Sequence, residues 1–261
     1  MKLMYLFTRA ATLLMFSLLA ACATVPPGGA APSATAATAA TDPWENWNRK
    51  VYAFNDTVDE AVLKPIATAW RDNVPALLRQ GVSNFFGNVG DVWSTANHFL
   101  QGKVSGGLEM GMRVMSNTLF GLVGVLDPAT EFGLTRRSED FGQTLAVWGV
   151  GKGPYVVLPL LGPSTLRDSF ALPLDSYASR LNWYFDSVNY YVTTPLQLVQ
   201  LRAELLDTTK LLDQISLDKY SFVRDAFLAR RLDQIHDGAP PLPTFEDEPA
   251  DEAPKAAPKK P

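Results

Sequence analysis

Few residues of this chain have the types and spacing that enzyme chemistry needs. It has two histidines, His98 and His236, and a single cysteine, Cys22. A hydrolase places an activated nucleophile beside a base, often in a Gly-x-Ser-x-Gly turn. The nearest string, around Ser164, lacks the second glycine. Two histidines without further cysteine ligands also argue against a zinc site. We therefore predict no catalytic residue, no metal site and no cofactor.

Cys22 is a candidate for acylation and not for catalysis. It follows Leu19-Ala20-Ala21, an apolar run and the positive charges of Lys2 and Arg9. This layout is that of a secretory signal peptide, and a Cys placed directly after Leu-Ala-Ala resembles the bacterial lipobox. We expect cleavage before Cys22, acylation of its thiol and amine, and attachment to a membrane through the acyl chains.

The composition favours an apolar environment for part of the surface. Charged residues are 19% of the chain, against a usual quarter or so, and there are six Trp, eight Tyr and fourteen Phe. The net charge is -4 and no basic stripe is present, which argues against nucleic acid as a partner. After the signal, no run is long and apolar enough for a spanning helix.

The elements expected to position these residues are helices. Apolar residues recur at spacings of three and four, as in Val104, Leu108, Met112, Met115 and Leu119. We take Asp42 as an N-cap, Lys64-Pro65 as a helix end, Asp91 as a second cap and Gly102 as a C-terminal glycine. Strand-like alternation is scarce, with 155–158 the best candidate. We expect helices over residues 42–64, 75–86, 92–101, 103–120, 164–170, 175–191, 195–212 and 218–236.

Residues 121–163 interrupt the helical pattern. This stretch is apolar and rich in glycine, and it carries the charged patch Arg136-Arg137-Ser138-Glu139-Asp140. Long loops with such content commonly have a function. Gly149-Val-Gly-Lys-Gly153 matches neither a P-loop nor a dinucleotide fingerprint. A tight turn is therefore favoured for it over a phosphate cradle, although Lys152 is a candidate contact for a lipid phosphate.

A series of short motifs in unbroken order carries a resemblance to a known family. Over residues 42–212 the chain resembles the VacJ/MlaA family of outer-membrane lipoproteins, with Trp47 where we would expect Phe. The motifs are Asp42-Pro43-Trp44-Glu45-Asn46-Trp47-Asn48-Arg49, Tyr52-Ala53-Phe54-Asn55, Ala69-Trp70-Arg71-Asp72-Asn73-Val74-Pro75, Ser83-Asn84-Phe85-Phe86-Gly87-Asn88, Asn97-His98-Phe99-Leu100-Gln101-Gly102, Phe141-Gly142-Gln143-Thr144-Leu145, Gly149-Val150-Gly151-Lys152-Gly153-Pro154-Tyr155 and Leu166-Arg167-Asp168.

The resemblance implies a mostly α fold, a ring of amphipathic helices around a central amphipathic channel, lying in the inner leaflet of the outer membrane. It implies a lipid-anchored protein on the periplasmic side that is not an enzyme. Its implied partners are phospholipids, a trimeric porin and a periplasmic lipid carrier, to which mislocalised outer-leaflet phospholipids are passed. The alternatives are a structural, porin-associated lipoprotein that moves no lipid, and a phospholipase, for which no nucleophile and base can be assembled.

These observations divide the chain as follows: 1–21 a signal peptide, 22–41 the lipidated Cys22 and a flexible tether, 42–236 the helical domain, and 237–261 a disordered acidic, proline-rich tail. Within the domain we expect residues 119–141 to form a gating hairpin and 149–155 to border the channel. The candidate residues are Gly121, Gly124, Phe132, Gly133, Phe141, Gly149, Gly151, Lys152, Gly153 and Tyr155.

Overall fold

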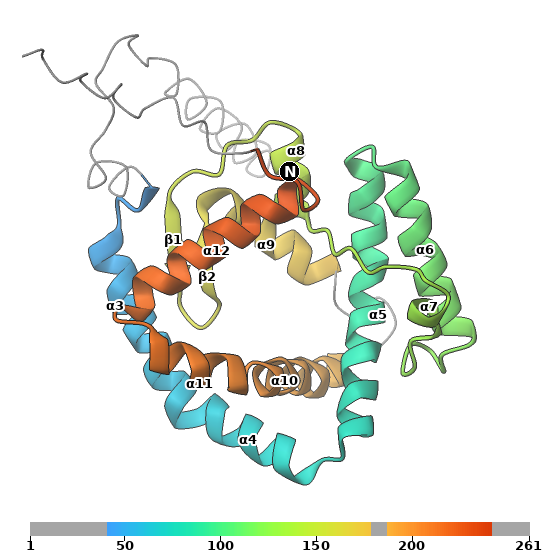
Figure 1. Cartoon of the computed structure of the whole chain (residues 1–261), viewed down its shortest axis with the longest axis horizontal. Helices are drawn as coiled ribbons and strands as arrows, with labels where there is room; N and C mark the ends of the chain where they lie inside the picture. The colour runs from blue at the N-terminus through green and yellow to red at the C-terminus, as the bar shows by residue number, and fades with distance from the viewer. Residues whose placement is uncertain (1–40, 179–186, 242–261) are drawn as a thin grey trace, which may run out of the picture. The chain divides into compact units, whose positions relative to one another are not determined.

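A computed structural model describes residues 41–178 and 187–241 of the chain. Helices make up most of this part, as the sequence predicts, and one short hairpin supplies the strands (Figure 1). The described residues all belong to one unit, Ala36–Thr244. Cys22, the tether and nearly all of the tail lie outside the described residues, so their predicted roles stay predictions.

The first helix does not end at Lys64-Pro65. Helix α3 (Glu45–Val58) runs through a π-helical turn, η2 (Asp59–Leu63), into α4 (Lys64–Asn73). Proline lacks an N–H and its ring would collide with the carbonyl four residues back in a regular helix. The wider π turn, in which Lys64 N bonds to Asp59 O, lets the chain pass Pro65 without stopping.

Asp42 is not the cap of α3. The helix begins at Glu45 after Trp44, and no side chain caps it. Asp42 is buried instead, where its carboxylate accepts hydrogen bonds from Asn48 Nδ2 at 2.8 Å and from the Tyr220 hydroxyl. The prediction that Asp42 caps the helix failed because a carboxylate can accept hydrogen bonds from donors far away in the sequence as readily as from the N–H groups of its own helix.

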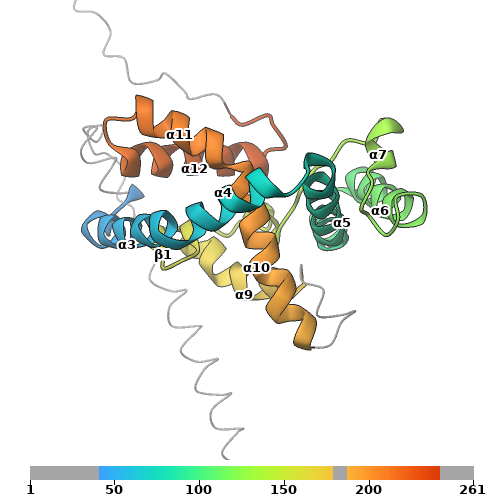
Figure 2. The same cartoon turned by 90° about the horizontal axis from the view of Figure 1, so that it is seen from below.

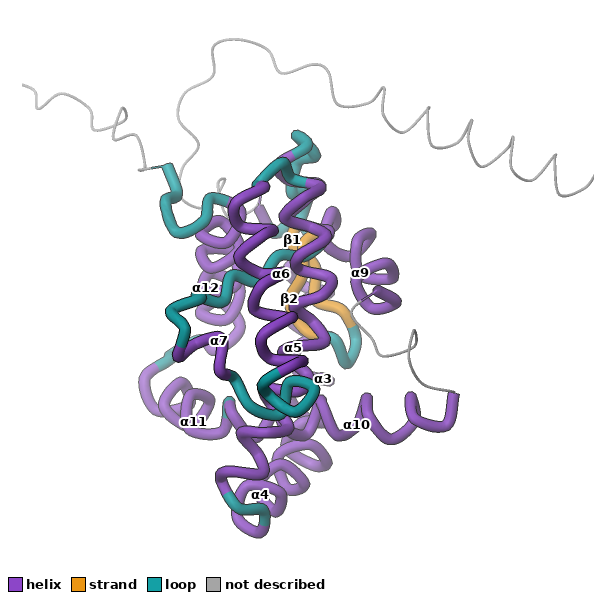
Figure 3. The backbone as a smooth tube through the Cα atoms, turned by 90° about the vertical axis from the view of Figure 1, so that its right-hand side faces the viewer, coloured by secondary structure: helices purple, strands orange, loops and turns teal. Residues whose placement is uncertain are grey.

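Two predicted helices are one. Helix α5 (Ala76–Leu100) continues through Asp91, which is buried and does not cap a helix. Gly102 does end the helix as predicted, with a φ of 75° and a bond from Lys103 N to His98 O. Helix α6 (Val104–Leu119) follows and packs antiparallel to α5 (Figure 3).

The stretch 121–163 contains more regular structure than expected. Short helices α7 (Pro128–Glu131) and α8 (Phe141–Val147) are capped by the side chains of Asp127 and Asp140. Strand β1 (Tyr155–Leu158), the predicted strand, pairs antiparallel with β2 (Gly162–Thr165). The two caps and the strand pairing involve residues that are close in the sequence, but the high glycine content of this stretch hid the pattern.

Four helices complete the described chain: α9 (Leu166–Ala178), α10 (Ser187–Glu204), α11 (Leu206–Ile215) and α12 (Lys219–Ile235). Helix α9 starts later than predicted because Ser164 and Thr165 belong to β2. Residues 175–178 continue α9, and the predicted helix 175–191 then crosses residues that are not described. The predicted helix 195–212 is divided differently, since α10 runs through Pro195 and a new helix begins at Leu206. Helix α12 lies within the predicted range 218–236, and the Asp218 side chain caps it by accepting bonds from Tyr220 N and Ser221 N.

The contacts between elements follow a closed circuit. β1 packs on α3, β2 on α12, α12 on α8, α8 on α5, α5 on α10 and α10 on α4. Helix α10 crosses between α4 and α5 (Figure 2). The apolar clusters are small: Val51, Tyr155, Val157 and Tyr220 form one, and Ala67, Ala203 and Leu206 another. Much of the interior must therefore be polar.

Candidate functional site

Helix α6 turns its apolar stripe outward. Val104, Leu108, Met112, Met115 and Leu119, which the sequence predicts as one face, are each at least 48% exposed. The residues that α6 buries are Gly107, Met110, Arg113 and Asn117. A helix in water does the reverse, because apolar surface leaves water and charge stays in it.

Helix α5 has the same inverted arrangement. Its buried residues are Gly81, Asn88, Asp91, Ser94, Asn97 and His98. Its exposed residues include Leu77, Leu78, Val92, Phe99 and Leu100. The α5–α6 pair thus hides its polar groups and presents apolar side chains, as expected of helices whose surroundings are apolar.

A strained apolar turn follows α6. Leu122 and Val123 have positive φ angles of 53° and 61°, which are rare for residues with a side chain. Gly121 and Gly124 make the turn possible: a Cβ at Gly121 would lie 2.5 Å from the carbonyl oxygens of Asn117 and Leu126. The side chains that the turn exposes are Phe120, Leu122, Val123, Val125 and Leu126.

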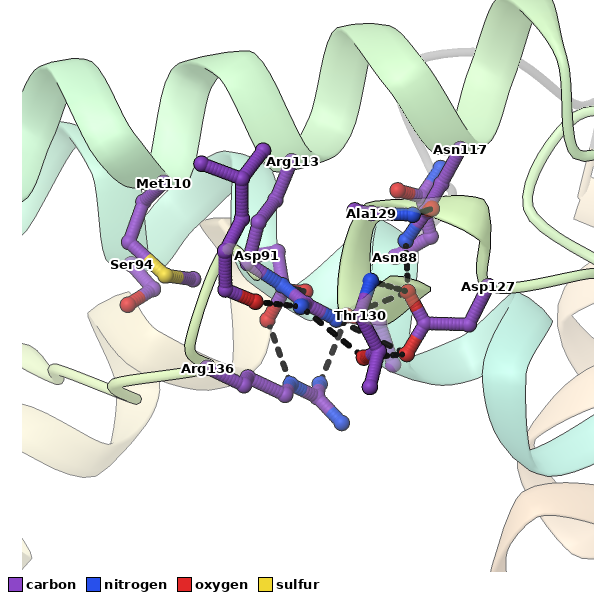
Figure 4. A network of polar contacts seen from close by, with 12 residues as sticks. Asn88, Asp91, Ser94, Met110, Arg113, Asn117, Asp127, Ala129, Thr130 and Arg136 are labelled. Atoms are coloured by element: carbon purple, nitrogen blue, oxygen red, sulfur yellow. Dashed lines mark hydrogen bonds and ion pairs between the residues drawn. The ribbon is translucent and has the colours of Figure 1, made fainter. Parts of the chain in front are cut away.

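An ion pair between the buried Arg113 and the partly exposed Asp127 fastens this turn to α6 (Figure 4). Nη2 of Arg113 donates to both carboxylate oxygens of Asp127, at 3.0 and 2.9 Å. Asn117 Nδ2 and the Thr130 hydroxyl donate to the same carboxylate at 2.9 and 2.6 Å. Burial alone would raise the pKa of Asp127, but the bonds from Thr130, Asn117 and Arg113 outweigh it and lower the pKa. The carboxylate is thus held in its charged form.

A second ion pair lies beside the first (Figure 4). Nε of Arg136 donates to Asp91 Oδ1 at 2.8 Å, and its Nη2 donates to Gly87 O at 2.8 Å. Asp91 is 1% exposed, and burial raises its pKa against the opposing effect of Arg136 and Arg113. Gly87 leaves the room for the guanidinium, since a Cβ there would lie 2.7 Å from Nη1 of Arg136.

A third charged cluster joins α8, α9 and α12. Arg231 donates to Asp140 at 2.6 and 2.7 Å and to Asp168 at 2.9 and 3.0 Å. Gly142 gives these groups their space, because a Cβ there would lie 2.5 Å from both Arg231 Nη2 and Asp168 Oδ1. The adjacent Arg167-Asp168 pair is part of this junction.

The predicted site residues fall into two groups. Gly121, Gly124, Phe132 and Gly133 lie on the segment that packs against α5 and α6, and the Phe132 side chain is exposed. Gly149, Gly151, Lys152 and Gly153 link α8 to β1, with positive φ angles at Gly149 and Gly153.

Two aromatic site residues differ from this pattern. Phe141 is half-buried at the start of α8, where its ring packs edge-on against Trp148 at 6.0 Å. Tyr155 is 1% exposed and packs with Tyr220 and Phe227 in an apolar cluster. Tyr155 therefore has a packing role, and its side chain does not border an open path.

The charged residues of the α5–α6 interior escaped sequence reasoning. The signal was present in α5, where Asn84, Asn88, Asp91, Ser94 and His98 recur at spacings of three and four. In a soluble protein, a polar stripe of that kind indicates the side of the helix that faces water.

Residues weighed for chemistry have structural partners. His98 is buried and donates through Nδ1 to Ser94 O at 2.9 Å. The Ser164 hydroxyl donates to Thr165 O at 3.2 Å and accepts a bond from Ser169 at 3.0 Å. Within residues 41–178 and 187–241, no cluster of three or more His, Cys, Asp or Glu could hold a metal ion. In the same part of the chain, no helix has the length and apolarity needed to cross a membrane.

Comparison with known proteins identifies the family. A family model described as MlaA lipoprotein matches residues 40–234. The chain is 39% identical over 209 residues to the intermembrane phospholipid transport system lipoprotein MlaA of Escherichia coli strain K12, covering 77% of this chain and 81% of that one. The chain belongs to the MlaA lipoprotein family.

Two further relatives extend the comparison. The protein of the same name from Haemophilus influenzae is 29% identical over 201 residues, covering 76% of this chain and 80% of that one. A solved structure described as "Structural basis for maintenance of bacterial outer membrane lipid asymmetry" superposes with a TM-score of 0.64 at 38% identity. The match covers 73% of this chain and 96% of that one. The resemblance to the MlaA family and the mostly α fold are thus confirmed.

Proposed function

We propose that this protein removes mislocalised phospholipids from the outer leaflet of the outer membrane and passes them inward to a periplasmic carrier. Membership of the MlaA family supports this proposal, as do the names of the relatives, which describe intermembrane phospholipid transport and outer-membrane lipid asymmetry. In this proposal the protein is anchored through a lipidated Cys22, faces the periplasm and associates with a porin trimer. It moves lipid without catalysing a reaction.

The observation that carries the proposal is the inverted α5–α6 pair. Its polar residues are buried and its apolar stripe is outward, so the pair is stabilised where the solvent is hydrocarbon. Each apolar side chain of that size gains about 1.5–3 kcal/mol when it is fully withdrawn from water. The pair would lie within one leaflet beside the lipid that is to be moved.

A lipid crossing between leaflets needs a polar path for its headgroup, because an unpaired charge in hydrocarbon costs several kcal/mol. We propose that the described helices surround an amphipathic channel, and the closed circuit of contacts supports that arrangement. Residues 119–141, with Gly121, Gly124, Phe132, Gly133 and Phe141, form the gate in this proposal. The linker Gly149, Gly151, Lys152 and Gly153 borders the channel, with Lys152 placed to meet a phosphate.

Two substitutions on the outward stripe test the membrane-facing role. Leu108→Glu with Met115→Glu adds two charges to residues that are 57% and 56% exposed, so folding in solution should tolerate them. A charge at the bilayer centre costs about 2.5–3.5 kcal/mol, so membrane association should weaken. Liposome binding by protein lacking residues 1–41 is the measurement, with Ala226→Glu and Ala229→Glu on the exposed side of α12 as the matched control. Equal loss of binding in both double variants would contradict the assignment.

Transport itself is tested in a strain that lacks the gene. The strain should accumulate outer-leaflet phospholipid and become sensitive to detergent, and the wild-type chain should restore it. A structural, porin-associated lipoprotein would restore porin complexes without changing the lipid content of the outer leaflet. Phospholipid hydrolysis by the purified protein, lost in Ser164→Ala or His98→Ala, would instead support an enzyme.

Membrane attachment is tested at Cys22. Cys22→Ala should abolish palmitate labelling and deplete the protein from the outer-membrane fraction, because delivery to that membrane depends on the acylated cysteine. Labelling that persists in the variant would rule out acylation at this residue. Labelled protein that fractionates with the inner membrane would rule out the proposed location.

A further inference from the structure

The proposed gate is bonded to α5 and α6 along most of its length. Asn84 of α5 donates to Val125 O at 3.1 Å. Farther along, N and Oγ1 of Thr135 donate to Glu109 of α6 at 3.0 and 2.9 Å. The Ser94 hydroxyl of α5 then donates to Arg137 O at 3.0 Å and accepts from Glu139 N at 2.8 Å. A segment bonded at so many points is not a loose loop.

Arg113 is the centre of these contacts (Figure 4). Only 2% of its side chain is exposed, and besides Asp127 it donates through Nη1 to Thr130 Oγ1 at 3.2 Å and to Leu134 O. One guanidinium therefore holds the residue before α7, the helix itself and the chain that follows it. Removing the Asp127 charge would leave the buried guanidinium of Arg113 without its main counter-charge.

Close packing adds to the bonds. A Cβ at Gly81 of α5 would lie 2.9 Å from Cγ1 of Val125. A Cβ at Gly124 would lie 2.6 Å from Cβ of Asn88. The turn thus rests on the backbone of α5 where larger residues would push it away. Opening the segment alone would break both the packing and the ion pairs.

We infer that Arg113 is the positioning residue of the candidate gate, and that it fixes residues 121–139 to α5 and α6 so that these parts move as one body. This inference rests on the proposed transport function and specifies its moving part. Access to the path would then change when the whole body shifts against the remaining helices. The segment itself would not open like a lid.

A disulfide inside the body tests the inference directly. In the double variant Gly81→Cys and Val125→Cys, the sulfur of residue 125 takes about the place of Val125 Cγ1. That atom lies 2.9 Å from the Cβ that a side chain at residue 81 would have. This spacing suits a disulfide, in which the two Cβ atoms are about 3.8 Å apart. Cys22 is the natural chain's one cysteine, so in the lipidated protein the new pair has no competing thiol. The oxidised and reduced forms should keep the outer leaflet equally free of phospholipid, with each single-cysteine variant as a control.

Hydrogen exchange on the full-length protein supplies a readout that does not depend on transport. In the wild type, peptides from 121–134 should be protected to the same extent as peptides from α6. Asp127→Asn removes the charge that faces Arg113 and should speed exchange in 121–134 at least tenfold. Asp207→Asn, at a carboxylate that is 90% exposed, is the matched control and should change nothing there.

The outcomes separate the inference from the function on which it rests. Loss of transport on oxidation, restored by reductant, would show that the segment moves against α5 and would overturn the inference while transport stands. Fast exchange of 121–134 in the wild type would overturn it as well. A strain that keeps its lipid asymmetry without the protein would refute the transport proposal, and the exchange data would still decide whether Arg113 fixes the segment.

Discussion

At the residue scale, a buried arginine needs several acceptors to be tolerated. Arg113 has a carboxylate, a hydroxyl and a carbonyl, while its Nε has no hydrogen-bond partner and lies 4.0 Å from Asp91. Asp91 is shared between this guanidinium and that of Arg136. The two arginines and two aspartates balance in charge, which offsets the cost of burying Arg113 and Asp91.

We predict a pH-dependent stability contribution from Asp127. Its pKa is lowered in the folded protein, so it stabilises the fold above the unfolded value of about 3.9 and loses this effect as the pH falls through the folded pKa. Asp127→Asn should lower the free energy of unfolding at pH 7 by about 3 kcal/mol. Denaturant unfolding in detergent at pH 7 and pH 3 measures this, and the difference from wild type should shrink at the lower pH. A constant difference would mean that charge is not the cause.

At the element scale, the turns depend on glycines at particular positions. The sequence shows these glycines but does not show which neighbouring atoms require them. Gly121 lies against two backbone oxygens, whereas a Cβ at Gly151 would meet nothing within 4 Å. The same residue type therefore has opposite tolerance in two parts of the candidate site. The difference depends on which atoms of the fold lie next to each glycine, and the helical periodicity of the sequence does not predict those neighbours.

Alanine substitutions should expose this difference. Gly121→Ala forces a Cβ to within 2.5 Å of the Asn117 and Leu126 oxygens, so the turn must shift and stability should fall by about 2 kcal/mol or more. Gly151→Ala should change stability by less than about 0.5 kcal/mol. Thermal unfolding of both variants decides the matter. Equal melting temperatures would contradict the turn geometry.

At the scale of the whole molecule, polar clusters join elements that are distant in sequence. Asp42, before α3, meets Tyr220 and Arg224 of α12, and Arg231 joins α12 to α8 and α9. The apolar clusters between these parts are small. The described unit thus relies on specific ion pairs where a soluble domain would use a continuous apolar core.

Loss of Arg231 should therefore affect the whole unit. Arg231→Met keeps much of the side-chain volume but leaves Asp140 and Asp168 without their shared cation, and the folded protein should lose about 3–5 kcal/mol. Protease sensitivity should rise in α8, α9 and α12 together. The control Arg230→Met changes an exposed neighbour on the same helix and should be nearly silent. Cleavage confined to α12 would argue against a joint role.

The sequence by itself determined the elements that local rules govern. The period of α6, the glycine that ends α5 and the β1 strand each follow from a few neighbouring residues. The same rules failed at Pro65, where a π turn absorbed the proline, and at Asp42 and Asp91, whose partners lie far along the chain. A short run of residues does not show which distant residues will be its partners in the fold.

Only the tertiary structure decided which face of each helix is inside. Periodicity shows that α5 and α6 have an apolar and a polar side, but the preferred side depends on the solvent and on the partners available to buried charges. The stripe from Val104 to Leu119 could by its period lie on either side of α6, and the structure exposes it while Arg113 is buried against Asp127. The physical reason is that these two residues are brought together only when the chain after α6 folds back onto it.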